Sequence, residues 1–182
     1  MRYEIVIAGI GGQGIVLSGT IVGTAAAVFG GLNATQIASY GPEAMGGRVY
    51  TEVVISDEEI DYPRVSSPDI LVVMSQRGYN EFSRKVKPGG LIIYDPDLVE
   101  ISRLEEVEQI AIPATKEAER LGLRISANMV MIGALTAFCD LLEPEMVEEA
   151  IRSRVRRSLE TNLKAFRRGY ELALSLRGAS GR

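Results

Sequence analysis

The sequence predicts an α/β fold: a Rossmann-like, mostly parallel sheet with an inserted antiparallel hairpin, helices on both faces and a C-terminal helical extension. Two observations predict it. Short apolar runs typical of buried strands alternate with helical segments four or five times. The first run, residues 5–8, leads directly into the glycine-rich turn Gly9–Gly14 and then into a long apolar segment. That order of strand, turn and helix is the one in which a G-x-G-x-x-G motif has structural meaning.

Several strands are expected in the α/β core, residues 1–142. The β-branched run Tyr3–Ala8 is the first, and the others are Asn33–Ser39, Tyr50–Ser56, Ile70–Met74, Leu91–Tyr94 and the weaker Val107–Ile112. The acidic turn at 57–59 suggests that residues 60–62 return antiparallel to 50–56 and form the inserted hairpin.

Helices are expected between these strands and after them. The first runs from about Gln13 to Phe29, because Gly30-Gly31 is a glycine C-cap. Later ones are expected at 78–86, before Pro88; at 115–121, after Pro113; and over the apolar segment 128–142. Pro144 opens a further helix, and leucines and aromatics stepping by three or four residues from Leu159 define the last. These form the C-terminal helices of residues 143–176, and 177–182 is expected to be a tail within a single domain of 1–182.

Composition excludes several classes of function. The net charge of −4 gives no electrostatic case for nucleic acid. A single cysteine, Cys139, rules out a disulfide framework and a set of iron–sulfur ligands. The absence of histidine removes Ser-His and Cys-His catalysis and most zinc chemistry from this chain acting alone. We therefore assign neither catalytic nor metal-binding residues.

Residues 5–42 contain no charged side chain, which is unusual for a helix at a protein surface. A signal peptide or a membrane span over 15–32 are two alternatives. Glu4 and the glycines argue against the first, and Ser18, Thr20 and Thr24 against the second. We expect a cytoplasmic protein whose first helix covers the sheet with one face and another subunit with the other. A helix buried wholly within one domain is the remaining alternative.

The glycine turn supplies a candidate ligand site of five residues: Gly9, Gly11, Gly12, Gln13 and Gly14. Glycines allow a tight turn and close approach of the backbone to an anion, and the first amides of the following helix are free to bind it. A nicotinamide dinucleotide site also needs an acidic residue at the end of the second strand. Residues 33–37 contain none, and no arginine for a 2′-phosphate, so NAD(P) binding is not expected.

A second loop follows the neutral stretch and contains Tyr40, Gly41, Pro42, Glu43, Gly46, Gly47 and Arg48. On composition alone it is an ordinary solvated loop. The loops at 9–14, 40–48, 75–77 and 95–97 all follow strands, so they are expected at one edge of the sheet. Asp95-Pro96-Asp97 is interpreted as turn chemistry, the basic run 152–157 as a solvated helix end, and Cys139 as a packed thiol.

Together, Gly9–Gly14 as G-x-G-G-Q-G and residues 40–47 as Y-G-P-E-x-x-G-G resemble the gamma subunit of 2-oxoacid:ferredoxin (acceptor) oxidoreductases of the 2-oxoglutarate, pyruvate and 2-ketoisovalerate types. The 2-oxoglutarate type is most similar. Residues 52–56, 128–135 and 162–170 extend the resemblance over essentially the whole chain. Met45 departs from it, because the family usually has arginine there; Arg48 is the candidate substitute.

The resemblance implies a subunit of a complex that oxidatively decarboxylates a 2-oxoacid with coenzyme A, giving an acyl-CoA and reduced ferredoxin. It implies alpha, beta and ferredoxin-like delta partners that hold thiamine diphosphate, magnesium and iron–sulfur clusters. This chain would complete the complex without redox chemistry of its own, be inactive alone, and contribute to coenzyme A binding. Two alternatives stay open: a stand-alone Rossmann-like nucleotide or coenzyme A module, and a purely structural assembly subunit.

Overall fold

A single sheet organises the molecule. The computed structural model describes residues 1–43 and 46–179, and six strands in this part of the chain pair in the order β2-β3-β1-β4-β5-β6. They are β1 (Arg2–Ile10), β2 (Asn33–Tyr40), β3 (Arg48–Ser56), β4 (Ile70–Val73), β5 (Leu91–Tyr94) and β6 (Glu108–Ala111). β1, β4, β5 and β6 pair in parallel, whereas β3 is antiparallel to both β1 and β2. The predicted mixed α/β sheet is confirmed.

The inserted hairpin is formed by different strands from those predicted. β2 and β3 pair antiparallel along their whole length, with Asn33 opposite Ser56 and Tyr40 opposite Val49. Residues 60–62, predicted to return along 50–56, form no strand. The loop at 40–48 is therefore the connection within the hairpin. Pro63 directly follows these three residues and cannot donate a backbone hydrogen bond to continue a strand.

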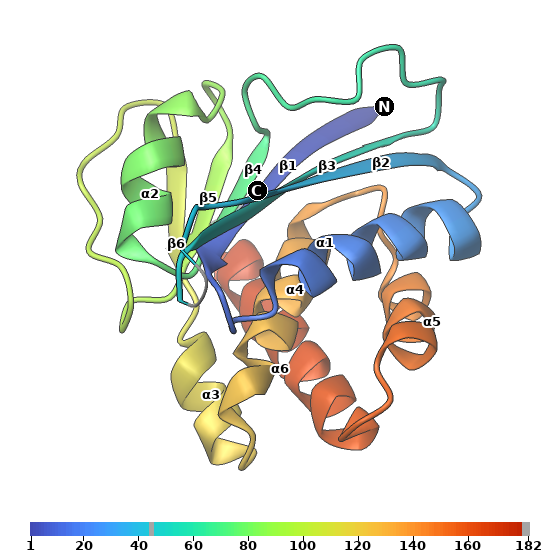
Figure 1. Cartoon of the computed structure of the whole chain (residues 1–182), viewed down its shortest axis with the longest axis vertical. Helices are drawn as coiled ribbons and strands as arrows, with labels where there is room; N and C mark the ends of the chain where they lie inside the picture. The colour runs from blue at the N-terminus through green and yellow to red at the C-terminus, as the bar shows by residue number, and fades with distance from the viewer. Residues whose placement is uncertain (44–45, 180–182) are drawn as a thin grey trace.

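Helices cover both faces of the sheet (Figure 1). α2 (Gln76–Phe82) and the 3₁₀ turn η2 (Ser83–Lys85) lie on one face. The other face carries α1 (Ile15–Thr24) with its π-helical continuation η1 (Ala25–Phe29), α3 (Ala114–Arg120), α4 (Ala127–Phe138), α5 (Pro144–Arg154) and α6 (Leu159–Ala179). A 3₁₀ turn, η3 (Arg124–Ser126), joins α3 to α4. The first helical segment ends at Gly30-Gly31 as predicted, and Gly31 has φ +66°.

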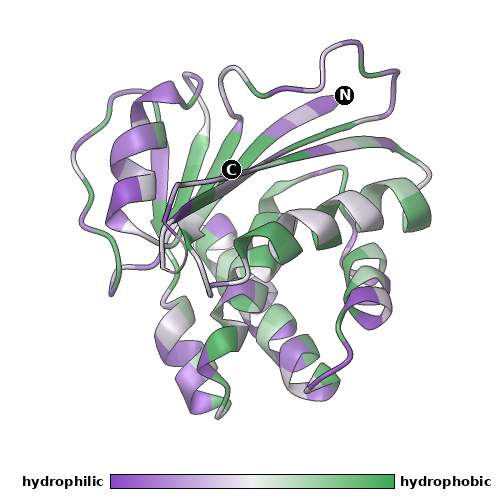
Figure 2. Ribbon diagram, viewed as in Figure 1, coloured by the Kyte–Doolittle hydropathy of each residue, from purple (hydrophilic) through white to green (hydrophobic). Residues whose placement is uncertain are grey.

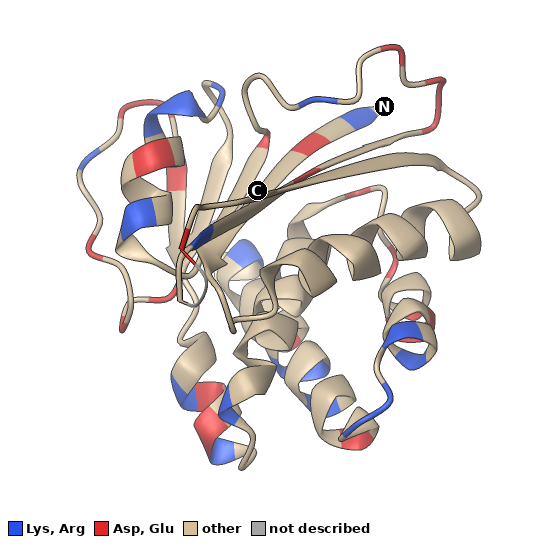
Figure 3. Ribbon diagram, viewed as in Figure 1, with Lys and Arg blue, Asp and Glu red and all other residues tan. Residues whose placement is uncertain are grey.

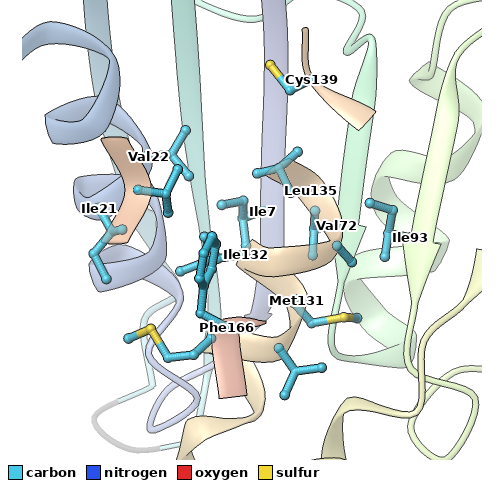
Figure 4. Packing of buried hydrophobic residues seen from close by; sticks show 14 of the residues in the cluster. Ile7, Ile21, Val22, Val72, Ile93, Met131, Ile132, Leu135, Cys139 and Phe166 are labelled. Atoms are coloured by element: carbon cyan, nitrogen blue, oxygen red, sulfur yellow. The ribbon is translucent and has the colours of Figure 1, made fainter. Parts of the chain in front are cut away.

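The larger core lies between the sheet and α4. Ile7, Val72 and Ile93 project from three neighbouring strands toward Ile132 and Leu135 of α4 (Figure 4). Phe166 of α6 is buried in the same core, with its ring beside Ile132. Gly133 and Gly169 lie where the two helices cross, and a methyl group on either would meet the opposing backbone. α5 and α6 carry hydrophilic residues along one side, as the hydropathy colouring of Figure 2 shows, and these sides face the solvent.

The C-terminal ends of α4 and α6 differ from the prediction, and both lie near Asp140. α4 ends at Phe138, four residues early, because Cys139 is extended. α6 continues to Ala179, beyond the predicted boundary at 176; residues 180–182 of the predicted tail lie outside the described part of the chain. Arg177 donates to the Ala137 carbonyl over 2.7 Å and pairs with Asp140 over 3.4 Å. Tyr3 of β1 donates to the same carboxylate over 3.2 Å, so the first strand and last helix meet there.

Candidate functional site

The two glycine-containing loops identified in the sequence contact each other at the carboxyl edge of the sheet. The Gly11 amide donates to the Gly47 carbonyl over 2.8 Å. β1 lies between β3 and β4, and the helices that follow β1 and β4 pack on opposite faces. This point of divergence is where open α/β sheets bind their ligands. The expectation that the loops share one edge is confirmed by the strand directions.

Gln13 fixes the shape of the glycine loop. Its side-chain oxygen accepts from the Ile10 amide over 2.9 Å, and its Nε2 donates to the Met74 carbonyl over 2.8 Å. The amide therefore bridges the ends of β1 and β4, two adjacent parallel strands. Gly9 is required because a methyl group there would meet Gln13 Oε1. The sequence interpretation left Gln13 free for a ligand, but both ends of its amide have partners within the chain.

Gly12 and Gly14 hold the backbone in conformations that other residues rarely adopt, with φ values of +93° and +73°. Gly14 is the N-cap residue of α1, and its carbonyl accepts from Asn128 of α4 over 3.3 Å. A methyl group on Gly14 would meet that buried amide. Apart from Gly12 and its two chain neighbours, no atom of residues 1–43 or 46–179 lies within 4 Å of the position a methyl group on Gly12 would take. Gly12 is thus the point at which the loop backbone is open to a ligand.

The hairpin loop directs its charges toward α2, away from the glycine loop. Glu43 pairs with Arg77 over 3.2 Å, and Gly41 and Gly47 leave space for its side chain. A hydrogen bond from its own backbone amide, together with Arg77, lowers the pKa of Glu43. Tyr40 is 66% exposed at the end of β2.

Arg48 has a partner that compensates its charge. Its guanidinium makes a bidentate contact with Glu81 over 2.6 and 2.5 Å and lies 4.7 Å from the centre of the Tyr50 ring. The bond from Arg48 lowers the pKa of Glu81. The suggestion that Arg48 serves as a free anion contact in place of the family arginine is therefore not supported. Met45, where that arginine would stand, lies outside the described residues.

A cleft of about 340 Å³ opens beside the glycine loop. Gly12 and Gln13 form one wall, and Met74, Leu98, Thr115, Arg124, Ile125 and Ala127 form the rest. These residues follow β1, β4, β5 and β6 or lead into α4, so every wall comes from the same edge of the sheet. Arg124 is the only cationic side chain among them, and Glu119 lies 3.7 Å from it.

Asp95 sets the position of the cleft wall contributed by α3. Its carboxylate is fully buried and accepts from the Thr115 amide and hydroxyl over 2.8 and 2.6 Å. It also accepts from the Asp97 amide over 3.0 Å, which confirms the predicted turn chemistry at 95–97. Asp95 therefore joins the end of β5 to the start of α3. This one buried carboxylate therefore holds Thr115 in the cleft wall.

Sequence reasoning found two of the cleft residues, Gly12 and Gln13, and missed the other walls. Gly9, Gly11 and Gly14 shape the loop without lining the cleft, and the described residues of the second loop, 40–43 and 46–48, do not line it either. Met74 and Leu98 could have been identified from the sequence, because Met74 ends the predicted strand 70–74 and Leu98 follows the predicted strand 91–94, both at this edge. Arg124 and Ile125 lie in a segment predicted as a connection, where no local pattern marks them.

Further features of the described part of the chain concern metal binding, thiol chemistry and membrane insertion. Residues 1–43 and 46–179 contain no cluster of histidine, cysteine, aspartate or glutamate able to hold a metal ion. Cys139 is buried, as predicted, and burial raises its thiol pKa to about 12. No helix within these ranges is both long enough and apolar enough to span a membrane.

Comparison with known proteins identifies the relatives. The family model described as pyruvate ferredoxin/flavodoxin oxidoreductase matches residues 4–172. The chain is 47% identical, over 97% of its length and 96% of the relative's, to 2-oxoglutarate synthase subunit KorC of Methanocaldococcus jannaschii. It is 49% identical to the subunit of the same name in Methanothermobacter thermautotrophicus, with 96% of each chain covered.

Solved structures agree with the sequence comparison. The gamma subunit of a keto/oxoacid ferredoxin oxidoreductase from Geobacter sulfurreducens superposes with a TM-score of 0.84 at 37% identity, over 95% of this chain and 99% of that one. A 2-oxoglutarate:ferredoxin oxidoreductase chain from Magnetococcus marinus, solved with 2-oxoglutarate, coenzyme A and succinyl-CoA, also gives 0.84, at 28% identity. It covers 96% of this chain and 31% of that one. The predicted resemblance to gamma subunits is confirmed, and the chain belongs to the pyruvate ferredoxin/flavodoxin oxidoreductase family.

Proposed function

We propose that this chain is the non-redox gamma subunit of a thiamine diphosphate-dependent 2-oxoacid:ferredoxin oxidoreductase, with 2-oxoglutarate as the substrate of the complex. Relatives of nearly the same length, at 47% and 49% identity, are named 2-oxoglutarate synthase subunits, which supports this choice of oxoacid. The complex forms succinyl-CoA and carbon dioxide and reduces ferredoxin. We propose a cytoplasmic location, because a chain with one thiol and no disulfide is typical of a reducing compartment.

The redox and carbanion chemistry of the complex belongs to its other chains. Iron–sulfur clusters need several thiolates, whereas this chain has one cysteine, buried and with a raised pKa. Thiamine diphosphate and its magnesium are assigned to the other chains because the family resemblance implies it and this sequence carries no evident thiamine site. Alpha, beta and ferredoxin-like delta partners would therefore hold these cofactors, and this chain is inactive without them.

The cleft beside Gly12 is the proposed contact of this chain with coenzyme A, and it is the observation that carries the proposal. The loop backbone is open at Gly12, α1 begins two residues after the cleft residue Gln13, and Arg124 adds positive charge to the cleft lining. These groups suit a phosphate. At about 340 Å³ the cleft lies near the lower end of the range for small-molecule sites, so it suits one segment of an extended cofactor.

The test uses the complete complex, produced with and without this chain. Activity is followed as 2-oxoglutarate-dependent reduction of an electron acceptor. Full activity without the chain would refute the proposed role as a subunit. In the complete complex, Arg124→Gln is expected to raise KM for coenzyme A about tenfold with little change in kcat, because it removes ground-state binding. Arg84→Gln, an exposed arginine on the opposite face of the sheet, is the matched control.

One observation favours the purely structural alternative: Gly11 and Gln13 already use their polar groups within the chain. If the glycine loop only holds the domain together, Arg124→Gln leaves KM for coenzyme A unchanged. Loop substitutions would then lower the yield of assembled complex and leave the kinetics of the assembled fraction intact. The stand-alone module makes a third prediction, which is tight binding of coenzyme A to the isolated chain by calorimetry.

A further inference from the structure

The two edges of the sheet differ in a way that the proposed function does not use. β6, at one edge, is four residues long and carries Glu108, which are two common means of protecting an edge from other strands. β2, at the other edge, is eight residues long and contains neither a charge nor a proline. Figure 3 shows that α1, η1 and β2 together carry no charged residue. β2 therefore lacks the usual protection against pairing.

The register of the hairpin identifies which backbone groups of β2 are unpaired. Gly41 opposes Arg48 and donates to its carbonyl, so every second residue back from Gly41 faces β3. The intervening residues, Ala34, Gln36, Ala38 and Tyr40, direct their amides and carbonyls outward. No hydrogen bond joins these backbone groups to any residue in 1–43 or 46–179. Such a row is the template for an added strand.

We propose that β2 pairs antiparallel with β2 of a second copy of this chain, making one continuous sheet across a two-fold axis. One register, in which Ala34 faces the other copy's Tyr40 and Gln36 its Ala38, engages all four outward residues. Each such pair exchanges two hydrogen bonds. The side chains also match in size, because a larger residue lies opposite an alanine in every pair. An isologous contact of this kind requires a self-complementary surface.

The distribution of charge on the chain favours a second copy of it as the partner that pairs with β2. Each chain has a net charge of −4, so two copies repel each other over most of their surfaces. The neutral stretch at 5–42 is where they can approach without opposing like charges. Leu17 of α1 and Val28 and Phe29 of η1, beside β2, are 36%, 66% and 40% exposed. In the paired sheet the two copies of α1 lie on the same face and flank the seam, where these side chains would be covered.

The test measures the mass of the purified full chain by light scattering at micromolar concentration. Twice the mass of one chain is expected, and a monomer would overturn the proposal. Ala38→Pro removes one outward amide and fills the edge with the proline ring, while every β2–β3 hydrogen bond remains, so the mass should fall to that of a monomer. Ala38→Ser, which keeps the amide, should remain a dimer.

Ala38→Lys provides a second route if the proline variant does not fold, because lysine blocks edge pairing without altering the backbone. Ala111→Lys is its control, an exposed alanine on the opposite edge strand, β6. In the dimer, hydrogen exchange should show slow exchange for the amides of Ala34, Gln36, Ala38 and Tyr40. In Ala38→Lys these amides should exchange fast, and the other amides of the chain should be unchanged. A dimer that persists in folded Ala38→Pro and Ala38→Lys would place the contact elsewhere and refute the pairing. None of these results depends on coenzyme A binding.

Discussion

Gly14→Ala tests whether the glycine loop and α4 are energetically coupled. Two costs add in this variant. The left-handed backbone at Gly14, with φ +73°, costs an alanine about 1–2 kcal/mol. The new methyl group also displaces the buried Asn128 amide and breaks its bond to the Gly14 carbonyl, which costs about 1 kcal/mol more. A loss of about 2–3 kcal/mol is expected, or roughly 4–12 °C in Tm for a domain of this size.

Gly12→Ala is the matched control, because it has a positive φ of +93° with open space around the methyl position. It should lose only the conformational part, about 1–2 kcal/mol. Urea denaturation measures both variants, and an unchanged m-value shows that the midpoint shift reports stability. The Asn128→Ala background completes the cycle: there the cost of Gly14→Ala should fall by about 1 kcal/mol. Equal losses for Gly12→Ala and Gly14→Ala, with additive double variants, would refute the coupling.

Three further predictions concern single side chains. Asp95→Ala leaves the buried Thr115 amide and hydroxyl without their acceptor, so urea denaturation should show a loss of about 2–4 kcal/mol; a loss below 1 kcal/mol would contradict its role in joining β5 to α3. The pKa of Glu81 is held below its ordinary 4.5, so its contribution to stability is complete above pH 4.5 and is lost as pH falls through the lowered value. Glu81→Gln should therefore cost about 1 kcal/mol at pH 7 and flatten the acid limb of the stability curve, and an unchanged acid limb would contradict the pairing with Arg48. Cys139, with a thiol pKa of about 12, should resist iodoacetamide at pH 8 in the folded chain and react once urea unfolds it; rapid alkylation of the folded chain would contradict its burial.

The sequence predicted the order of elements because each strand and helix is marked locally. Apolar runs define β1, β4 and β5, and Gly30-Gly31 and Pro144 define helix boundaries. Pairing between strands is not local, and there the prediction failed. Residues 33–40 and 48–56 pair across a loop whose glycines and proline are visible in the sequence. That hairpin and one formed with 60–62 both have a turn signal in the sequence, and the local difference is that 60–62 is only three residues long before Pro63.

The site was predictable only in part, for a related reason. The strain at Gly12 and Gly14 follows from the glycine spacing, so the loop could be located. The partners that give it shape are distant in sequence: Met74 lies 61 residues from Gln13, and Asn128 lies 114 residues from Gly14. From the sequence, Gln13 at the centre of the glycine motif is a candidate ligand contact. In the fold its side-chain amide donates to the Met74 carbonyl instead. The far wall, with Arg124 and Ile125, depends on how η3 is placed beside the sheet.

The meeting of Tyr3 and Arg177 at Asp140 has a consequence for how the domain can be connected to other polypeptides. β1 begins at the edge of the sheet opposite the cleft, and α6 ends beside it. A linker at either end of the domain would therefore leave from the side remote from Gly12. Domains with neighbouring termini can be joined to longer chains with little distortion. The Magnetococcus marinus chain is a longer relative in which this domain matches 31% of the length.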